Sequence, residues 1–130
     1  MSSDAPLPTD AELKILRVLW SAGPSTVREV MESLDTDQEY TTVLKHLQIM
    51  LDKGLVTRDE SGRAHVYAAA REEADTQRRL VEDLLTRAFS GSAETLVMRA
   101  LSSEAVTREE LDEIRALLDE IDDRDDTDAS

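Results

Sequence analysis

The chain contains no cysteine, so it can form neither a disulfide framework nor a thiolate metal site. A reducing compartment suits such a chain, and we expect a cytoplasmic location. It has one Trp, two Tyr and one Phe, so its core must consist mainly of Leu, Val, Ile and Ala. No apolar run reaches the roughly 18 residues of a membrane span. The first ten residues, MSSDAPLPTD, lack the basic and apolar regions of a secretory signal.

Motifs of enzymes and metal centres are also missing. The sequence has two histidines, no glycine-rich phosphate loop and no Ser-His-Asp arrangement in a suitable context. The acidic pairs Asp122-Asp123 and Asp125-Asp126 lack the glycine and the spacing of a calcium loop, so a solvated acidic segment explains them better. We therefore predict a protein that is not an enzyme and needs no metal or cofactor.

The net charge of −14 argues against general affinity for nucleic acid. The acid is unevenly distributed, however. Residues 1–67 contain 7 Lys/Arg and 11 Asp/Glu, whereas residues 68–130 contain 8 Arg and 18 Asp/Glu. A locally basic face in the first half is therefore compatible with the composition. Such a protein should bind non-specific DNA weakly, which favours recognition of one particular sequence.

The stretch from residue 40 to 67 is the one around which the chain is organised. A helix is predicted first, ended by Gly54, because apolar residues recur at helical spacing: Val43, Leu47, Met50 and Leu51. Leu55 then begins a strand, residues 59–62 form a turn, and residues 63–67 form a second strand. Its alternation puts one group on the outward side: Arg63, His65 and Tyr67. A helix followed by a hairpin is typical of a winged helix-turn-helix, with the helix in the major groove and the hairpin on the flanking backbone.

Two shorter helices are predicted before this stretch. Each starts with a capping box, Thr9 to Glu12 and Thr26 to Glu29. The first helix ends near Ser21, leaving Ile15 and Trp20 available to pack elsewhere, and the second is followed by a loop over residues 35–38. Residues 1–8 are expected to be disordered. Three helices and a hairpin thus give a winged-helix domain over residues 1–69.

From residue 71 onward the pattern predicts three more helices, the last one opened by a capping box from Thr107 to Glu110. They contain too little chain to bury their apolar residues alone, so we predict a helical dimerisation domain over residues 70–122 and a homodimer. Residues 123–130 are predicted to be an acidic disordered tail. The fold class is therefore mostly α with a small β-hairpin. The predicted dimer interface contains the following residues: Leu80, Leu84, Leu85, Leu96, Val97, Leu101, Leu111, Ile114, Leu117 and Leu118.

The candidate DNA-contacting residues of the third helix lie opposite its apolar stripe. Thr41, Thr42 and Lys45 can reach base edges or phosphates there; the alternative is that Thr41 only caps the helix and Lys45 is solvated. Gln48 lies farther along the helix. His46 either donates to a phosphate or packs beside the core.

Other candidates come from the neighbouring elements. Arg63 and His65 of the hairpin can reach the phosphate backbone, although a surface arginine on a hairpin is often idle. Arg28 stands at the start of the second helix, where a helix N-terminus also attracts phosphate. Trp20 and Tyr67 are better explained as core or hinge residues than as groups that stack on bases.

The order of these motifs resembles the BlaI/MecI/CopY family of bacterial repressors, the penicillinase-repressor family. The resemblance extends from about Pro8 to Ile121. It implies a dimer whose winged helices read a palindromic operator, and repression that proteolysis or another signal relieves. The residues that carry it are these: Pro8-Thr9-Asp10-Ala11-Glu12-Leu13, Val18-Leu19-Trp20, Gly23-Pro24-Ser25-Thr26-Val27-Arg28-Glu29-Val30, Tyr40-Thr41-Thr42-Val43, Lys53-Gly54-Leu55-Val56, Gly62-Arg63 and Val66-Tyr67.

Three departures from the family pattern affect what the resemblance implies. The copper-responsive branch has C-terminal cysteines, and this chain has none. The Asn-Phe pair at which inactivating cleavage falls in some members corresponds here to Arg99-Ala100. The resemblance therefore does not identify the sensor protease or other inducer that relieves repression. Ile49 replaces an arginine that is frequent in the reading helix.

Two functions follow from the sequence. The first is a sequence-specific transcriptional repressor that binds operator DNA as a homodimer. The second is a winged-helix module that binds another protein through its acidic helices and touches DNA little. The negative charge favours the second, whereas Thr41, Thr42, Lys45, Arg63 and the family resemblance favour the first.

Overall fold

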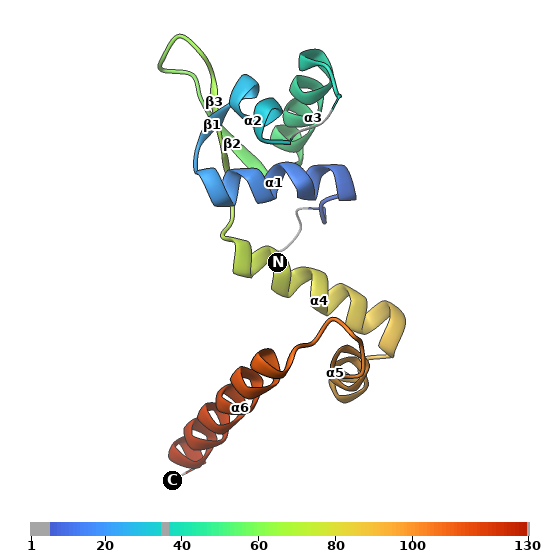
Figure 1. Cartoon of the computed structure of the whole chain (residues 1–130). Helices are drawn as coiled ribbons and strands as arrows, with labels where there is room; N and C mark the ends of the chain where they lie inside the picture. Colours follow the sequence, from blue (N-terminus) through green and yellow to red (C-terminus); the bar gives the residue numbers. More distant parts are fainter. Residues whose placement is uncertain (1–5, 35–36, 130) are drawn as a thin grey trace. The chain divides into compact units, whose positions relative to one another are not determined.

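The computed structural model describes residues 6–34 and 37–129, and side chains up to residue 124. Its elements follow the order drawn in Figure 1: α1 (Asp10–Ala22), β1 (Ser25–Thr26), α2 (Val27–Leu34), α3 (Tyr40–Lys53), β2 (Val56–Asp59), β3 (Val66–Ala69), α4 (Glu73–Phe89), α5 (Ala93–Leu101) and α6 (Arg108–Ala129). The predicted class, mostly α with a small hairpin, is confirmed. Contacts divide the chain into two units, Met1–Glu82 and Asp83–Ser130, so the division falls inside α4, beyond the predicted boundary after residue 69.

The first unit has a single apolar core beneath α1, α2 and α3. Ile15 belongs to it, although the sequence pattern left this residue to pack elsewhere. The side chain of Trp20 is half-buried, and its Nε1 donates to the Arg71 carbonyl at 2.9 Å, which joins α1 to the segment entering α4. The buried apolar residues are these: Ile15, Leu16, Leu19, Val27, Val30, Val43, Leu47, Met50, Leu55, Val56 and Tyr67.

The sheet has three antiparallel strands in the order β1-β3-β2. β1 was not predicted, because its two residues carry only the signal of a helix cap; Ser25 pairs with Tyr67 in this register. The second hairpin strand begins at Val66, so Arg63 and His65 lie in the hairpin loop and not on the strand as predicted. That loop projects beyond α2 (Figure 1).

The predicted strand alternation was wrong for Tyr67. Its side chain is 0% exposed and belongs to the core, although the pattern grouped it with the outward Arg63 and His65. The physical reason is size: burying a tyrosine ring removes far more apolar surface from water than burying the alanines beside it. Of the two roles predicted for Tyr67, core or hinge, its burial confirms the core role.

The three predicted capping boxes and the predicted end of α3 at Gly54 are confirmed. In all three capping boxes the threonine hydroxyl accepts from the backbone amide three residues on, and the glutamate accepts from the threonine amide. Gly54 ends α3 with a φ of 80° in the left-handed region, which favours glycine. These local signals fix where α3 starts and stops, and therefore which residues it presents.

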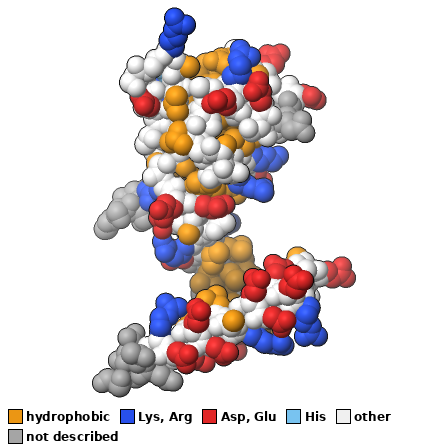
Figure 2. All heavy atoms as spheres, turned by 60° about the vertical axis from the view of Figure 1, so that its left-hand side comes forward, with side chains coloured by type: hydrophobic (Ala, Val, Ile, Leu, Met, Phe, Trp, Pro, Cys, Tyr) orange, Lys and Arg blue, Asp and Glu red, His pale blue; other side chains and the backbone are white. Residues whose placement is uncertain are grey.

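The second unit has no buried side chain between residues 83 and 124. Leu84, Val97, Leu101, Leu117 and Leu118 of the predicted dimer interface are exposed, and the other five predicted residues are half-buried. Figure 2 shows hydrophobic side chains gathered at the surface of this unit, with acidic side chains along the helix beside them. α6 continues to Ala129, so the tail predicted to be disordered is helical as far as the structure describes it. The predicted disorder of residues 1–5 and the loop at 35–36 lie outside the described residues.

Within the described part of the chain, no helix is both long and apolar enough to cross a membrane.

Candidate nucleic-acid interface

α3 presents a polar face directly opposite the residues that it buries. Val43, Leu47 and Met50 are fully buried in the core. Residues three and four apart share a helix face, so the other side of α3 faces outward. Besides Ile49, which is 39% exposed, it carries these exposed polar residues: Thr41, Thr42, Lys45 and Gln48. Lys45 has no carboxylate partner among the residues described, so its charge is available to a ligand.

His46 behaves differently from its neighbours on α3. Its ring is half-buried, and its Nδ1 is covered without a hydrogen-bond partner in the described structure. Of the two predicted roles for His46, packing beside the core fits this burial better. Its ring also helps to line a shallow hollow of about 430 Å³ on α3 together with these residues: Thr41, Thr42, Lys45 and Ile49.

A second hollow, of about 660 Å³, lies where α2, α3 and the hairpin meet; we call it the wing hollow. It brings together four of the predicted DNA-binding residues from three elements: Arg28, Gln48, Arg63 and His65. The Arg28 guanidinium lies 5.7 Å from the centroid of the Tyr40 ring, a cation–π distance that orients it. Neither Arg28 nor Arg63 has a carboxylate partner within the described part of the chain.

Sequence reasoning missed Arg58, which also lines the wing hollow. Arg58 stands opposite Tyr67 in the β2–β3 register and donates from Nε and Nη2 to Oε2 of Glu60 at 2.9 and 2.7 Å. The nearby Tyr67 hydroxyl and the Glu60 carboxylate raise the pKa of Arg58. The hydroxyl itself makes no hydrogen bond of ordinary geometry with any described group. The correct pairing of β2 with β3 would have placed Arg58 beside Tyr67 and so in this hollow. The sequence just before the turn contains no motif that indicates a binding role for residue 58.

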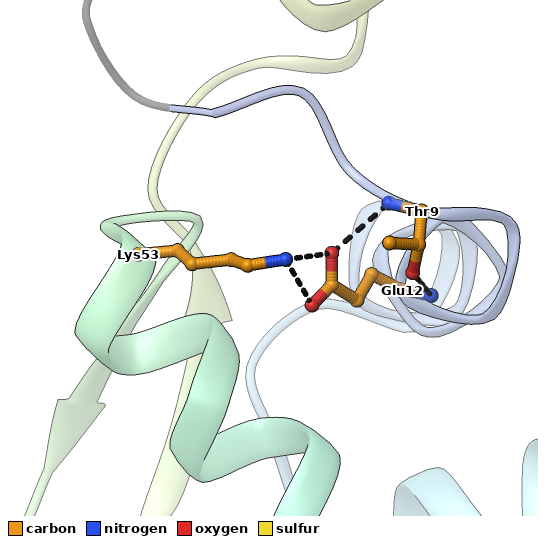
Figure 3. A network of polar contacts seen from close by, with 3 residues as sticks. All are labelled: Thr9, Glu12 and Lys53. Carbon is orange, nitrogen blue, oxygen red and sulfur yellow. Dashed lines mark hydrogen bonds and ion pairs between the residues drawn. The ribbon is translucent and has the colours of Figure 1, made fainter.

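An ion pair between the end of α3 and the start of α1 fixes the two helices against each other (Figure 3). Glu12 on α1 is only 3% exposed, and both its oxygens accept from Nζ of Lys53, at 3.0 and 2.9 Å. The Thr9 amide donates to the same carboxylate at 3.0 Å. Lys53 is the last residue of α3, so this pair holds the C-terminal end of α3 in place.

The described residues contain no group of three or more His, Asp or Glu side chains that could hold a metal ion. The arrangement is a polar helix face beside a hollow lined by three arginines, which suits contact with base edges and phosphates.

The sequence model of the penicillinase repressor family matches residues 8–120. The penicillinase repressor of Bacillus licheniformis is 26% identical over 114 residues, covering 86% of this chain and 89% of that protein. The transcriptional regulator BlaI of Mycobacterium tuberculosis is 35% identical over 116 residues, covering 86% and 83%. The solution structure of monomeric Bacillus licheniformis BlaI with the blaP half-operator gives a TM-score of 0.48 at 27% identity, covering 55% of this chain and 90% of that one. The chain belongs to the penicillinase repressor family.

Proposed function

We propose that this DNA-binding transcriptional repressor works as a homodimer on a palindromic operator, with α3 as its reading helix and the β2–β3 hairpin as its wing. One observation carries the proposal. The exposed polar face of α3 lies beside the wing hollow, which gathers unpaired cations from α2 and the hairpin. Occupation of the operator would block polymerase.

The residues of the interface divide by role. Thr41, Thr42, Lys45 and Gln48 can enter a major groove with α3, where hydroxyl, ammonium and amide groups meet base edges. Arg28, Arg63 and His65 flank them on α2 and the hairpin loop, where charge on a phosphate backbone fixes the register of the protein on the duplex.

The second unit supports dimerisation. A unit of 48 residues without a buried side chain among residues 83–124 cannot be stable by itself, because it removes too little apolar surface from water. A second copy would cover the same leucines on both chains. Two reading helices related by a two-fold axis then need half-sites about 10 base pairs apart or a multiple of that.

The overall acidity is consistent with this role. Repulsion between a chain of charge −14 and DNA weakens non-specific binding, so most of the affinity must come from a matching site. We place the working protein in the cytoplasm, where bacterial operators are. Relief by a protease would require cleavage within α5, where Arg99 and Ala100 are exposed.

The test is selection of fragmented genomic DNA on the purified full-length protein, followed by sequencing of the retained fragments. We expect a few sites that share an inverted repeat. The matched control is the double variant Thr42→Ala with Lys45→Ala, which should retain none of them. Retention of no fragment above background by the wild type at moderate salt would refute the proposal in favour of the protein-binding module.

A further inference from the structure

The wing hollow concentrates positive charge around a buried hydroxyl. Arg28, Arg58, Arg63 and His65 all line it, and Tyr67 forms part of its wall. The Tyr67 side chain is 0% exposed, and its hydroxyl lies against the Arg58 guanidinium, whose pKa it raises. The hydroxyl makes no hydrogen bond of ordinary geometry with any described group, so it and the guanidinium beside it are both suited to an oxygen acceptor in the hollow.

The carboxylate of Glu60 already pairs with one of these positive groups, Arg58. Oε2 of Glu60 accepts from two nitrogens of Arg58, at 2.9 and 2.7 Å, while its Oε1 lies 3.9 Å from Nε2 of His65. The Glu60 carboxylate thus accepts from the Arg58 guanidinium with one oxygen and faces the His65 imidazole with the other. A phosphate group offers the same kind of oxygens, and a guanidinium donates to phosphate oxygens as readily as to carboxylate oxygens.

The contact with Glu60 is easily exchanged. The side chains of Glu60 and Arg58 are 55% and 25% exposed, and ion pairs that are open to solvent contribute little stability. Glu60 lies in the hairpin loop just beyond β2, so it can leave Arg58 without disturbing the core. Loss of this pair therefore costs little when a stronger oxyanion arrives.

We propose that the wing hollow is a site for one phosphate group, with Arg58 as its central ligand, and that Glu60 occupies Arg58 until a phosphate replaces it. Arg63 and Arg28 complete the positive lining, and the His65 imidazole stands beside them. This inference rests on the proposed function where the phosphate belongs to operator DNA, but the site itself would also accept inorganic phosphate.

The first arm measures affinity and its salt dependence on a duplex carrying the inverted repeat selected above, using full-length protein. Arg58→Gln should bind about 10-fold more weakly, and its plot of log K against log salt should be less steep by about 0.9, the loss of one phosphate contact. Glu60→Gln should bind about 3- to 5-fold more tightly, because the competing carboxylate is gone. Adding Glu60→Gln to Arg58→Gln should then give no gain.

Asp59→Asn is the matched control, because it removes the neighbouring carboxylate, which accepts from the Ser61 amide and not from Arg58. Competition between Glu60 and phosphate is refuted if Asp59→Asn tightens binding as much as Glu60→Gln. It is equally refuted if the gain from Glu60→Gln persists without Arg58.

The second arm titrates the full-length protein with sodium phosphate against sodium chloride of equal ionic strength, and follows the arginine Nε–Hε signals by NMR. A shift at Arg58 that saturates at lower phosphate in Glu60→Gln supports the site without any DNA. If wild type binds no duplex, the repressor proposal fails while this arm still tests the hollow. An NMR shift at Arg58 together with unchanged DNA binding by Arg58→Gln identifies free phosphate as the occupant. Weaker DNA binding by Arg58→Gln without an NMR shift at Arg58 identifies a phosphate of the DNA backbone. If neither an NMR shift at Arg58 nor a loss of DNA binding is seen, the phosphate site is refuted.

Discussion

At the scale of single residues, Glu12 has the most demanding environment. It is the one buried carboxylate among the described residues, and it serves both the capping box of α1 and the ion pair with Lys53. Burial by itself would raise the pKa of Glu12, but the Lys53 ammonium and the Thr9 amide together bring it below the ordinary 4.5. The charged form is therefore the one that the fold stabilises.

Replacing Glu12 by Gln should lower the free energy of unfolding by about 1.5–3 kcal/mol at pH 7, the range for hydrogen bonds to charged groups. Since the pKa is depressed in the folded state, the stabilisation is complete above about pH 4.5 and is lost as the pH falls through the folded value. The difference between wild type and Glu12→Gln should shrink over that window. Urea unfolding at pH 7 and pH 3.5 measures it.

The control is Glu32→Gln, which removes an exposed carboxylate of α2 without a described ion pair. It should change stability by less than about 0.5 kcal/mol at either pH. An equal loss in both variants would mean that Glu12 acts only through net charge.

At the scale of the element, the ends of α3 determine which side chains face outward. Gly54 stops α3 with a φ of 80°, and nothing lies within 4 Å of the place where a Cβ would be. A side chain there would therefore meet conformational strain and no clash.

Gly54→Ala should lower the free energy of unfolding by about 1 kcal/mol, the cost of the left-handed conformation for a residue with a Cβ. Gly62→Ala is the control, since Gly62 has no positive φ and its added Cβ would meet only the Ala64 carbonyl, at 3.9 Å. Thermal unfolding followed by circular dichroism compares them. Equal effects would show that Gly54 is not needed to end α3.

The double variant Thr42→Ala with Lys45→Ala tests α3 as the reading element. We expect about 100-fold weaker operator binding, from two lost contacts of somewhat over 1 kcal/mol each, and a shallower salt dependence. Both side chains are exposed, so thermal stability should be unchanged. Fluorescence anisotropy with a labelled operator duplex measures the affinity.

Lys14→Ala with Ser33→Ala removes the same charge and one hydroxyl from a different hollow, on α1 and α2. This control should bind the operator like wild type. Wild-type affinity of the α3 variant would exclude α3 as the reader.

At the scale of the whole molecule, the two units differ in what stabilises them. The described residues of the first unit include eleven buried apolar ones, whereas residues 83–124 of the second unit include none. Large apolar side chains there, such as Leu84 and Leu117, remain exposed in the single chain. A second copy is the occupant that we propose for this surface.

Leu84→Asp with Leu117→Asp should therefore produce monomers, because each carboxylate would be buried without a partner in the dimer. Sedimentation velocity across a concentration series measures the oligomeric state. Thr86→Asp with Ser103→Asp adds the same charges at exposed polar positions and should stay dimeric. An unchanged profile for the leucine variant would place the interface elsewhere.

The sequence by itself determined the helices and most of their ends, although α6 continues to Ala129 through the segment predicted to be disordered. Capping boxes at Thr9, Thr26 and Thr107, the glycine after α3 and the helical spacing of apolar residues are local signals, which act within a turn or two. These signals also placed Thr41, Thr42, Lys45 and Gln48 outward and, with the motif order, indicated the family.

Only the tertiary structure decided the interactions that depend on contacts between distant parts of the chain. The two-residue strand β1 forms because it pairs with β3. The Tyr67 side chain lies inward because burying its ring in the core removes much apolar surface from water. The pairing of Glu12 with Lys53 spans 41 residues, and the place of Arg58 in the wing hollow follows from strand register. Such interactions arise from packing, which no local pattern encodes.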